Sequence, residues 1–316
     1  MNFKKPKFWD LKKTNFVSKI FFPFTIFLRI SNFLLNTKIK KKNSNIQSIC
    51  VGNIYIGGTG KTPSTIKLYE IFQKLNFNVC AGKKFYSNHI DEEKILKKKT
   101  SFISGKNRLE IMEKAIEYKK ELIIFDDGLQ DKNLDFDLKI VCFDAENWIG
   151  NGQLIPSGPL RETIDSLKKY DVVFLKNQSS DLKEINEIIK INNPNIKIFL
   201  TDYRPINLNK FDKNQKYLIF SGIGNPESFK KSLIKNNFKI VKEIIFPDHY
   251  NYKNSDIEKI KLIAKEYNAK IITTEKDFVK MSISSRKNID FLEIDLIISK
   301  EAELINFIKK RLNEKN

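Results

Sequence analysis

The sequence predicts an α/β protein with a parallel-sheet domain, a smaller α/β domain toward the C-terminus and a basic amphipathic segment in front. Three observations carry this prediction. Strand-like and helix-like patterns alternate from residue 46 onward, and a glycine-rich loop joins the first strand to the first helix. Residues 1–42 combine large apolar side chains with more than half of the net charge. Such alternation favours parallel strands with helices on both faces of the sheet.

Residues 1–42 are expected to lie at a membrane surface. They hold ten lysines and Arg29 against one acidic residue, Asp10, and so supply +10 of the net +19. Phe, Leu and Ile beside Lys and Arg suit the lipid headgroup layer, where each basic residue adds about 1 kcal/mol near an anionic leaflet. Lys19, Pro23 and Arg29 interrupt the apolar stretch, whereas a membrane span needs about 20 apolar residues. Packing of these apolar side chains onto the body of the protein is the alternative.

The overall charge does not indicate nucleic-acid binding. Only six of the 57 basic residues are arginine, and Lys, Asn and Ile are used heavily throughout, as in proteins of AT-rich genomes. We therefore expect no nucleic-acid partner. Three scattered cysteines and two histidines exclude a disulfide scaffold and argue against a Cys/His zinc site. A reduced, cytoplasmic setting is the natural interpretation.

The elements of two domains follow in order along the chain. In the first domain, expected at 43–205, apolar runs predict strands at 46–51, 79–81, 122–125, 137–143 and 171–175, and helical spacing predicts helices at 61–75 and 108–118. A polar stretch at 203–216 marks the boundary. In the second domain, expected at 206–316, the same patterns predict strands at 216–220, 238–245, 269–273 and 289–294 and helices at 226–235, 257–267 and 300–311.

The glycine-rich loop predicts a nucleotide-binding domain of the P-loop NTPase type. Eight consecutive residues form the expected phosphate-binding loop: Tyr55, Ile56, Gly57, Gly58, Thr59, Gly60, Lys61 and Thr62. Its glycines let backbone N–H groups turn inward around phosphate oxygens, beside the positive end of the following helix. In such a loop Lys61 reaches the β- and γ-phosphates and the Thr62 hydroxyl binds Mg²⁺. Tyr55 replaces the usual first glycine, and a plain tight turn is the alternative.

An acidic strand end supports nucleotide binding. Asp126 and Asp127 end the apolar strand at 122–125, and carboxylates at the end of a neighbouring parallel strand lie where the nucleotide metal binds. An Asp-Asp-Gly turn without a ligand is the alternative. Since no Asn-Lys-x-Asp string specifies guanine, we predict ATP and Mg²⁺ as the cofactors.

Several strings resemble the tetraacyldisaccharide 4'-kinase family, the lipid A kinases. They stand at residues 6–9, 51–54, 57–63, 126–130, 156–162, 220–226, 246–249 and 274–277, in the same order as in the family. The resemblance implies transfer of the γ-phosphate of ATP to the 4'-hydroxyl of a tetraacyldisaccharide 1-phosphate, which forms lipid IVA. It also implies a peripheral enzyme on the cytoplasmic face of the inner membrane of a Gram-negative bacterium.

The resemblance further implies the partners and the domain arrangement. The partners are the lipid A disaccharide 1-phosphate precursor and the cytoplasmic leaflet, and no obligate protein partner is inferred. The smaller domain closes the cleft that holds the active site. The runner-up function is a P-loop switch ATPase acting on a protein or metal partner, which needs no base for an acceptor hydroxyl.

The family pairs an Asp with a His as the base that activates the hydroxyl, and the matching residues are Asp91 and His249. A sugar hydroxyl is a poor nucleophile until a positioned group takes its proton, and His is the usual side chain for this task at neutral pH. Lys61 completes the expected catalytic set. The alternatives are that His249 is a surface or capping residue and that His89 is the base.

Departures from the family pattern leave some roles open. Where the family has Ser-Arg-Gly-Tyr, this chain has Gly-Lys-Lys-Phe, so Lys83 and Lys84 either steer phosphate or are solvated. Arg161 and Glu162 match the family, and an arginine kept in so lysine-rich a chain suggests bidentate phosphate binding. Arg108 is a weaker candidate that fits a helix surface equally well. Asp131 stands where the family often has His and is assigned no role.

Overall fold

The computed structural model describes residues 5–34, 46–86, 90–177 and 182–314. The chain forms two compact units. The larger unit comprises Lys5–Phe85, Thr100–Asp202 and Leu296–Asn316, and the smaller contains Tyr86–Lys99 and Tyr203–Asp295.

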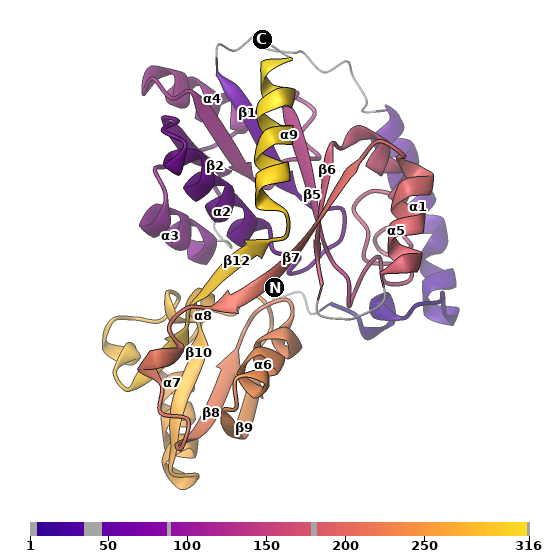
Figure 1. The fold of residues 1–316 in the computed structure, drawn as a ribbon. Coiled ribbons are helices and arrows are strands. Elements are labelled where there is room, and N and C mark those ends of the chain that lie inside the picture. Colours follow the sequence, from indigo (N-terminus) through magenta and orange to yellow (C-terminus); the bar gives the residue numbers. More distant parts are fainter. Residues whose placement is uncertain (1–4, 35–45, 87–89, 178–181, 315–316) are drawn as a thin grey trace. The chain divides into compact units, whose positions relative to one another are not determined.

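Within the residues that the structure describes, the larger unit is built on an eight-stranded sheet. Its strand order is β12-β7-β6-β5-β1-β4-β2-β3 (Figure 1). The strands are β1 Gln47–Gly52, β2 Val79–Lys84, β3 Phe102–Gly105, β4 Leu122–Asp126, β5 Leu138–Asp144, β6 Val172–Lys176, β7 Lys197–Pro205 and β12 Ile294–Ile298. All neighbouring pairs from β7 to β3 are parallel. This confirms the predicted parallel α/β sheet.

Helices cover both faces of this sheet. The helices of the larger unit are α1 Phe16–Leu34, α2 Lys61–Lys74, α4 Arg108–Glu117, α5 Lys183–Asn192 and α9 Glu301–Asn313, with short 3-10 turns η1 Lys7–Asp10 and η2 Ile164–Lys169. Helices α4 and α5 pack on hydrophobic clusters of one face. On the other face, α2 contacts β1 and β4, and α9 contacts β5. Successive side chains of a strand point to opposite faces of the sheet. In these central strands the side chains on both faces are mostly apolar, as expected for strands covered by helices on both sides.

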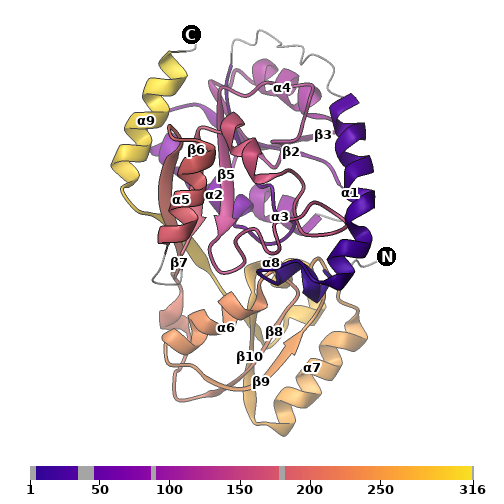
Figure 2. The same ribbon diagram turned by 90° about the vertical axis from the view of Figure 1, so that its right-hand side faces the viewer.

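In the described part of the smaller unit, four strands form an all-parallel sheet in the order β11-β10-β8-β9. Its strands are β8 Lys216–Ser221, β9 Lys239–Ile245, β10 Ala269–Thr274 and β11 Ile289–Leu292, and its helices are α3 Ile90–Lys99, α6 Pro226–Lys235, α7 Asn254–Glu266 and α8 Glu275–Phe278, with 3-10 turns η3 Leu208–Lys210 and η4 Ser284–Arg286. Alternate residues of β8 pack toward α6 and toward α7. Helices therefore lie on both faces of this sheet as well (Figure 2).

Two pieces of the chain group differently from the expected domain ranges. Residues 86–99 belong to the smaller unit, because α3 packs against α8. Residues 296–316 belong to the larger unit, because β12 joins the eight-stranded sheet and α9 contacts β5. The single strand predicted at 289–294 is therefore wrong. The chain forms β11 in one sheet, breaks at Glu293, and continues as β12 in the other sheet.

Helix α1 turns its polar side inward and leaves apolar side chains exposed. Ser18 is fully buried, donates to the carbonyl oxygen of Ser157 (2.9 Å) and accepts from the Asn151 amide (2.7 Å). Phe16 and Phe27, by contrast, are 77% and 73% exposed. The apolar side chains described for α1 are thus mostly exposed rather than buried on the body of the protein, although Phe21 stacks on Phe8 with ring centroids 6.4 Å apart. This arrangement disfavours the packing alternative.

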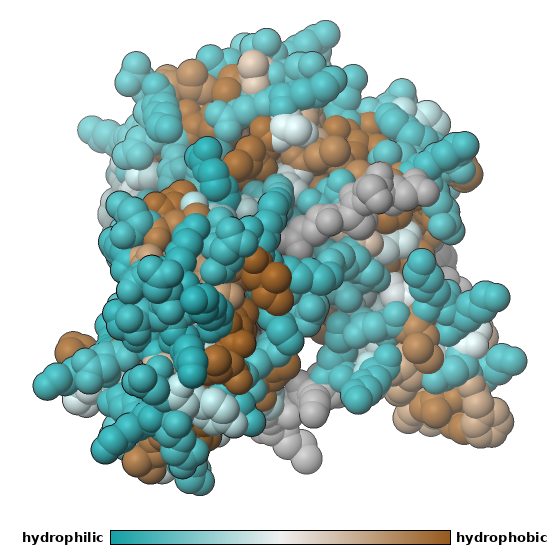
Figure 3. All heavy atoms as spheres, turned by 60° about the horizontal axis from the view of Figure 1, so that its bottom comes forward, coloured by the Kyte–Doolittle hydropathy of each residue, from teal (hydrophilic) through white to brown (hydrophobic). Residues whose placement is uncertain are grey.

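Exposed apolar residues also occur away from α1, on the face drawn in Figure 3. Figure 3 shows them as separate brown patches within a largely hydrophilic face. The run on α1 is denser, since Phe16, Val17, Ile20, Phe21, Phe22, Phe24, Ile26 and Phe27 are all exposed. None of the described helices is long and apolar enough to cross a bilayer.

Candidate active site

The phosphate-binding loop connects β1 to α2, as predicted. Gly57 and Gly60 have φ angles of 141° and 90°, a region that side-chain-bearing residues rarely adopt. The Asn53 amide fixes the loop from inside, because it donates to the carbonyl oxygen of Tyr55 (2.5 Å) and to the Thr59 hydroxyl (2.9 Å). Lys61 and Thr62 then begin α2.

The Gly-Pro-Leu-Arg-Glu string runs beside this loop. The N–H of Ile56 donates to the carbonyl oxygen of Pro159 (2.9 Å), and the N–H of Arg161 donates to that of Ile54 (2.7 Å). Two strings far apart in the sequence therefore form one structural unit. The backbone pairing explains how Arg161 reaches the acidic strand end described next.

Asp126 lies at the carboxyl end of β4, which pairs directly with β1. Its Oδ2 accepts hydrogen bonds from the Thr62 hydroxyl and from the Lys83 ammonium, both at 2.8 Å. The Lys83 and Asp126 side chains are only 4% and 0% exposed. Asp126 Oδ1 is buried and has no hydrogen-bond partner among the described residues. A hydroxyl and an unused carboxylate oxygen are ligands that suit Mg²⁺.

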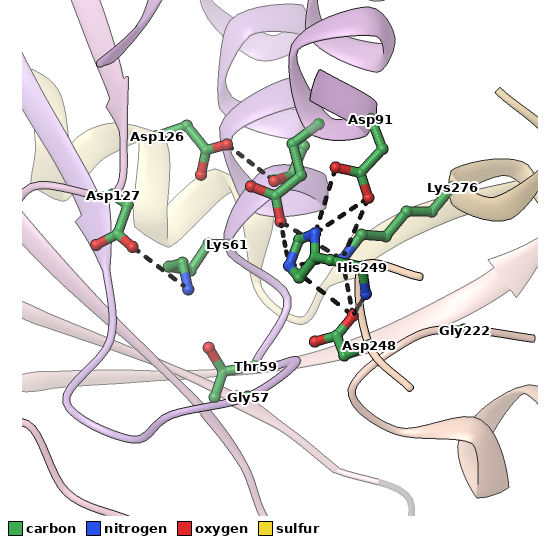
Figure 4. Close-up of polar contacts among 12 residues, drawn as sticks. Gly57, Thr59, Lys61, Asp91, Asp126, Asp127, Gly222, Asp248, His249 and Lys276 are labelled. Carbon is green, nitrogen blue, oxygen red and sulfur yellow. Dashed lines mark hydrogen bonds and ion pairs between the residues drawn. The ribbon is translucent and has the colours of Figure 1, made fainter. Parts of the chain in front are cut away.

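Asp127 points toward a different set of cations. Its carboxylate lies 3.6 Å from the Lys61 ammonium and 3.1 Å from the Arg161 guanidinium. Burial opposes ionisation of Asp127, but the charges of Lys61 and Arg161 outweigh it and hold its pKa well below the ordinary value. The two adjacent acids thus differ in surroundings. Asp126 keeps a free oxygen, whereas Asp127 pairs with Lys61 (Figure 4) and with Arg161.

Arg108 holds the backbone at the end of β4 in place. Its Nε and Nη2 donate to the backbone carbonyl oxygen of Asp127 (2.9 and 2.5 Å), and its Nη1 pairs with Asp131 at 2.8 Å. A Cβ at Gly128 would come within 2.6 Å of the Arg108 Nε. The helix-surface interpretation of Arg108 is therefore wrong, and Asp131 has a structural partner that sequence reasoning did not find.

The remaining predicted substrate residues lie in the same unit. Glu162 accepts a hydrogen bond from the Tyr170 hydroxyl (2.8 Å). Lys84 is half-buried at the end of β2, one residue beyond Lys83. Their contacts with a substrate stay predictions.

The smaller unit brings Asp91 and His249 together from 158 residues apart in the chain. Asp91 lies in the first turn of α3, and His249 lies in the turn after β9 with a φ of 56°. Nδ1 of His249 is 3.2 Å from Asp91 Oδ2 and 3.3 Å from Oδ1. The alternative that His249 is only a surface residue does not fit this contact. His89, the rival base, lies outside the described residues.

Charged residues that sequence reasoning missed surround this pair. Lys276 lies 3.3 Å from His249 Nε2, 3.2 Å from Asp248 and 3.6 Å from Glu92. Lys280 lies 3.5 Å from Asp91. Burial disfavours the ionised form of Asp91, but the hydrogen bond to His249 and the two lysines lower its pKa to about 2.

Helix α8 positions the two lysines. Thr274 caps it, since its hydroxyl accepts from the N–H of Asp277 (3.1 Å) and donates to that carboxylate (2.7 Å). Asp277 also accepts from the N–H of Gly222 (2.9 Å) and pairs with Lys280 (3.0 Å). The Thr-Glu-Lys-Asp string was noted only for its likeness to a family. Its local signal was the capping pattern, which starts α8 at Thr274 and so fixes where Lys276 lies in the turn.

Comparisons with known protein families, sequences and structures all find members of one kinase family. The family model described as Tetraacyldisaccharide-1-P 4'-kinase matches residues 17–313. A tetraacyldisaccharide 4'-kinase of Pelagibacter ubique (strain HTCC1062) is 49% identical over 320 residues and covers 100% of both chains. That of Rickettsia bellii (strain OSU 85-389) is 36% identical and covers 89% of this chain and 90% of the relative. In fold, LpxK from Aquifex aeolicus in complex with ATP matches with a TM-score of 0.66 at 22% identity, over 93% of this chain and 97% of that one.

Proposed function

The chain belongs to the tetraacyldisaccharide-1-P 4'-kinase family and is a kinase of lipid A biosynthesis, and from this premise we propose how its residues carry out the transfer. ATP is the phosphate donor and the 4'-hydroxyl of a tetraacyldisaccharide 1-phosphate is the acceptor, so that the product is lipid IVA. The observation that carries the proposal is the loop between β1 and α2, whose Thr62 is hydrogen-bonded to Asp126.

The larger unit binds the nucleotide in this proposal. Backbone N–H groups of residues 57–62 surround the β- and γ-phosphates, and Lys61 offsets the charge that develops during transfer. Thr62 and the unpaired Oδ1 of Asp126 would hold Mg²⁺, which neutralises phosphate charge when bound. Asp127 keeps Lys61 and Arg161 in place rather than binding the metal.

The smaller unit supplies the base. Nδ1 of His249 is engaged by Asp91, so Nε2 is the nitrogen that takes the proton of the 4'-hydroxyl. Asp91 remains ionised at neutral pH, because its pKa is about 2, and it supports the positive imidazolium that forms. A switch ATPase needs no such pair, which argues against the runner-up function.

Substrate phosphate is assigned to Arg161 and Lys84. Arg161 is part-exposed and presents a planar guanidinium suited to bidentate phosphate binding. Lys83 is committed to Asp126 by a buried ion pair, so we assign it to holding that carboxylate. Glu162, bonded to Tyr170, orients the segment that carries Arg161.

The reaction itself is the first test. The protein, incubated with γ-labelled ATP, Mg²⁺ and a tetraacyldisaccharide 1-phosphate in detergent, should place the label on the 4'-oxygen. Removing Mg²⁺ with EDTA should abolish transfer, because the phosphates lose their counter-charge. Excess Mg²⁺ should restore transfer. Label transfer from GTP at equal efficiency would contradict the assignment of ATP. Folded protein that binds ATP but labels no lipid would contradict the acceptor.

We also propose that α1 rests in the headgroup layer of the cytoplasmic leaflet of the inner membrane. Its exposed aromatic side chains and the lysines of residues 5–19 suit an anionic interface. A multi-acyl lipid cannot leave the bilayer without exposing its chains to water, so the enzyme must meet it at the surface. Contact through α1 supplies that orientation.

Replacing Phe16, Phe24 and Phe27 by Gln should weaken binding to vesicles of mixed neutral and anionic phospholipid by at least about tenfold, since each buried Phe contributes roughly 1.5–3 kcal/mol. Sedimentation with the vesicles measures this. The matched control replaces Ile191, Leu262 and Ile283, three exposed apolar residues elsewhere, by Gln. Equal losses in the two triple variants would sink the assignment of α1.

A further inference from the structure

Lys276 lies beside Nε2 of His249, whereas Asp91 contacts Nδ1. Its Nζ is 3.3 Å from Nε2, while Nδ1 is 3.2 Å from Asp91 Oδ2. An ammonium can only donate, so Nε2 must present a lone pair to it. A carboxylate can only accept, so Nδ1 must carry the proton. Both contacts therefore specify the same tautomer of a neutral ring.

Two carboxylates on the Nε2 side favour a proton there instead. Glu92 Oε1 and Asp248 Oδ1 lie 3.8 and 3.9 Å from Nε2, too far for hydrogen bonds but near enough to attract a positive ring. The Lys276 ammonium is closer to both carboxylates, at 3.6 and 3.2 Å. It therefore pairs with both carboxylates, and its charge offsets the negative charge that would otherwise favour a protonated His249 ring.

Lys280, one turn further along, does not share this task. It is buried, pairs with Asp277 (3.0 Å) and donates to the carbonyl oxygen of Gly222 (3.0 Å). It also approaches Asp91 Oδ2, at 3.5 Å. The charged groups around the His249 ring include Asp91 and Glu92 from α3, Asp248 from its own turn and Lys276 from α8.

We propose that Lys276 is a positioning residue of the transfer reaction, which keeps Nε2 of His249 free of a proton until the acceptor hydroxyl takes its place. The inference rests on the proposed role of His249 as base. Lys276 can withdraw from Nε2 without losing all its partners, because Asp248 and Glu92 remain within reach and its side chain is 21% exposed. The hydroxyl proton then passes to Nε2 as the new oxygen–phosphorus bond forms and the bond to the β-phosphate oxygen breaks.

Nitrogen NMR of the imidazoles tests this directly. The chain has two histidines, so protein labelled with ¹⁵N-histidine gives two ring systems, and a His89→Gln variant assigns them. In the wild type at pH 7, Nε2 of His249 should have the resonance of a nitrogen with a lone pair. In Lys276→Met it should shift to that of a protonated nitrogen. kcat should fall by about tenfold, part of the about 10²-fold that a positioned base supplies, with the KM for ATP unchanged.

Controls separate this inference from the proposed base. Lys276→Gln, which is also uncharged, should behave like Lys276→Met and guards against a folding defect in the first variant. Lys230→Met removes an ion-paired lysine of the same unit, bonded to Glu243 at 2.7 Å, and should change neither readout. An unchanged Nε2 resonance or an unchanged kcat in both Lys276 variants overturns the inference alone. Wild-type kcat in a His249→Asn variant overturns the base itself, whatever Lys276 does.

Discussion

Replacing His249 by Asn is expected to lower kcat by about 10²-fold or more and to leave ATP binding unchanged. In the proposed mechanism the imidazole takes the hydroxyl proton, whereas the nucleotide loop belongs to the other compact unit. Asn is preferable to Ala because the backbone at this position has a φ of 56°, a conformation that Asn tolerates well. Single-turnover transfer measures the chemical step, and calorimetric titration measures the ATP affinity.

Tyr250→Phe is the matched control for the same turn. It removes only the hydroxyl that bonds Asp256 at 3.1 Å, so it should leave kcat within about twofold of wild type. A His249→Asn variant that turns over at the wild-type rate would favour the switch ATPase. A variant that loses ATP binding would show that the substitution acts on the fold rather than on proton transfer.

Replacing Asp126 by Asn should have the largest effect on the larger unit. It leaves the buried Lys83 ammonium without its counter-charge, which costs about 3 kcal/mol, and it removes the carboxylate oxygen assigned to Mg²⁺. Thermal unfolding without nucleotide should therefore begin roughly 6–12 °C lower. Titration with Mg²⁺ should no longer strengthen ATP binding.

A second buried ion pair provides the comparison. Asp144 and Lys176 lie 2.7 Å apart, nearly fully buried, at the ends of β5 and β6. Asp144→Asn should destabilise the protein to a similar extent, yet Mg²⁺ should still strengthen ATP binding. The double variant Lys83→Met with Asp126→Asn should regain much of the stability but none of the Mg²⁺ dependence. Mg²⁺ dependence retained in Asp126→Asn would place the metal ligand elsewhere.

Elements with strong local patterns were predictable from the sequence. Strands β1, β4, β5 and β6 are mostly apolar and buried, and helices α2 and α6 have clear starts, at Gly60 and at the Asn225 cap. Their boundaries differ from the predicted ones by at most one residue. Elements without such patterns were missed. Helix α3 is rich in lysine, β3 has only four residues, and β7 mixes exposed and buried positions without a regular period.

The candidate site divides in the same way. The loop residues, Asp126 and Asp127 stand in short local motifs, and the pairing of Asp91 with His249 was expected only from a family resemblance. Lys276 stands in the string at 274–277 that shares this resemblance, but no pattern in the sequence assigned it a role. Its importance comes from a distance to His249 that a lysine-rich sequence cannot reveal, because every lysine looks alike until its neighbours are known.

The sequence by itself determined the parallel α/β architecture, the nucleotide loop and the acidic strand end, since these depend on residues close together in the chain. Tertiary structure alone decided that β11 and β12 enter different sheets and that Asp126 and Asp127 face different cations. It also turned the polar side of α1 inward. These features depend on which distant residues meet, and such meetings are set by the packing of whole elements rather than by local propensity.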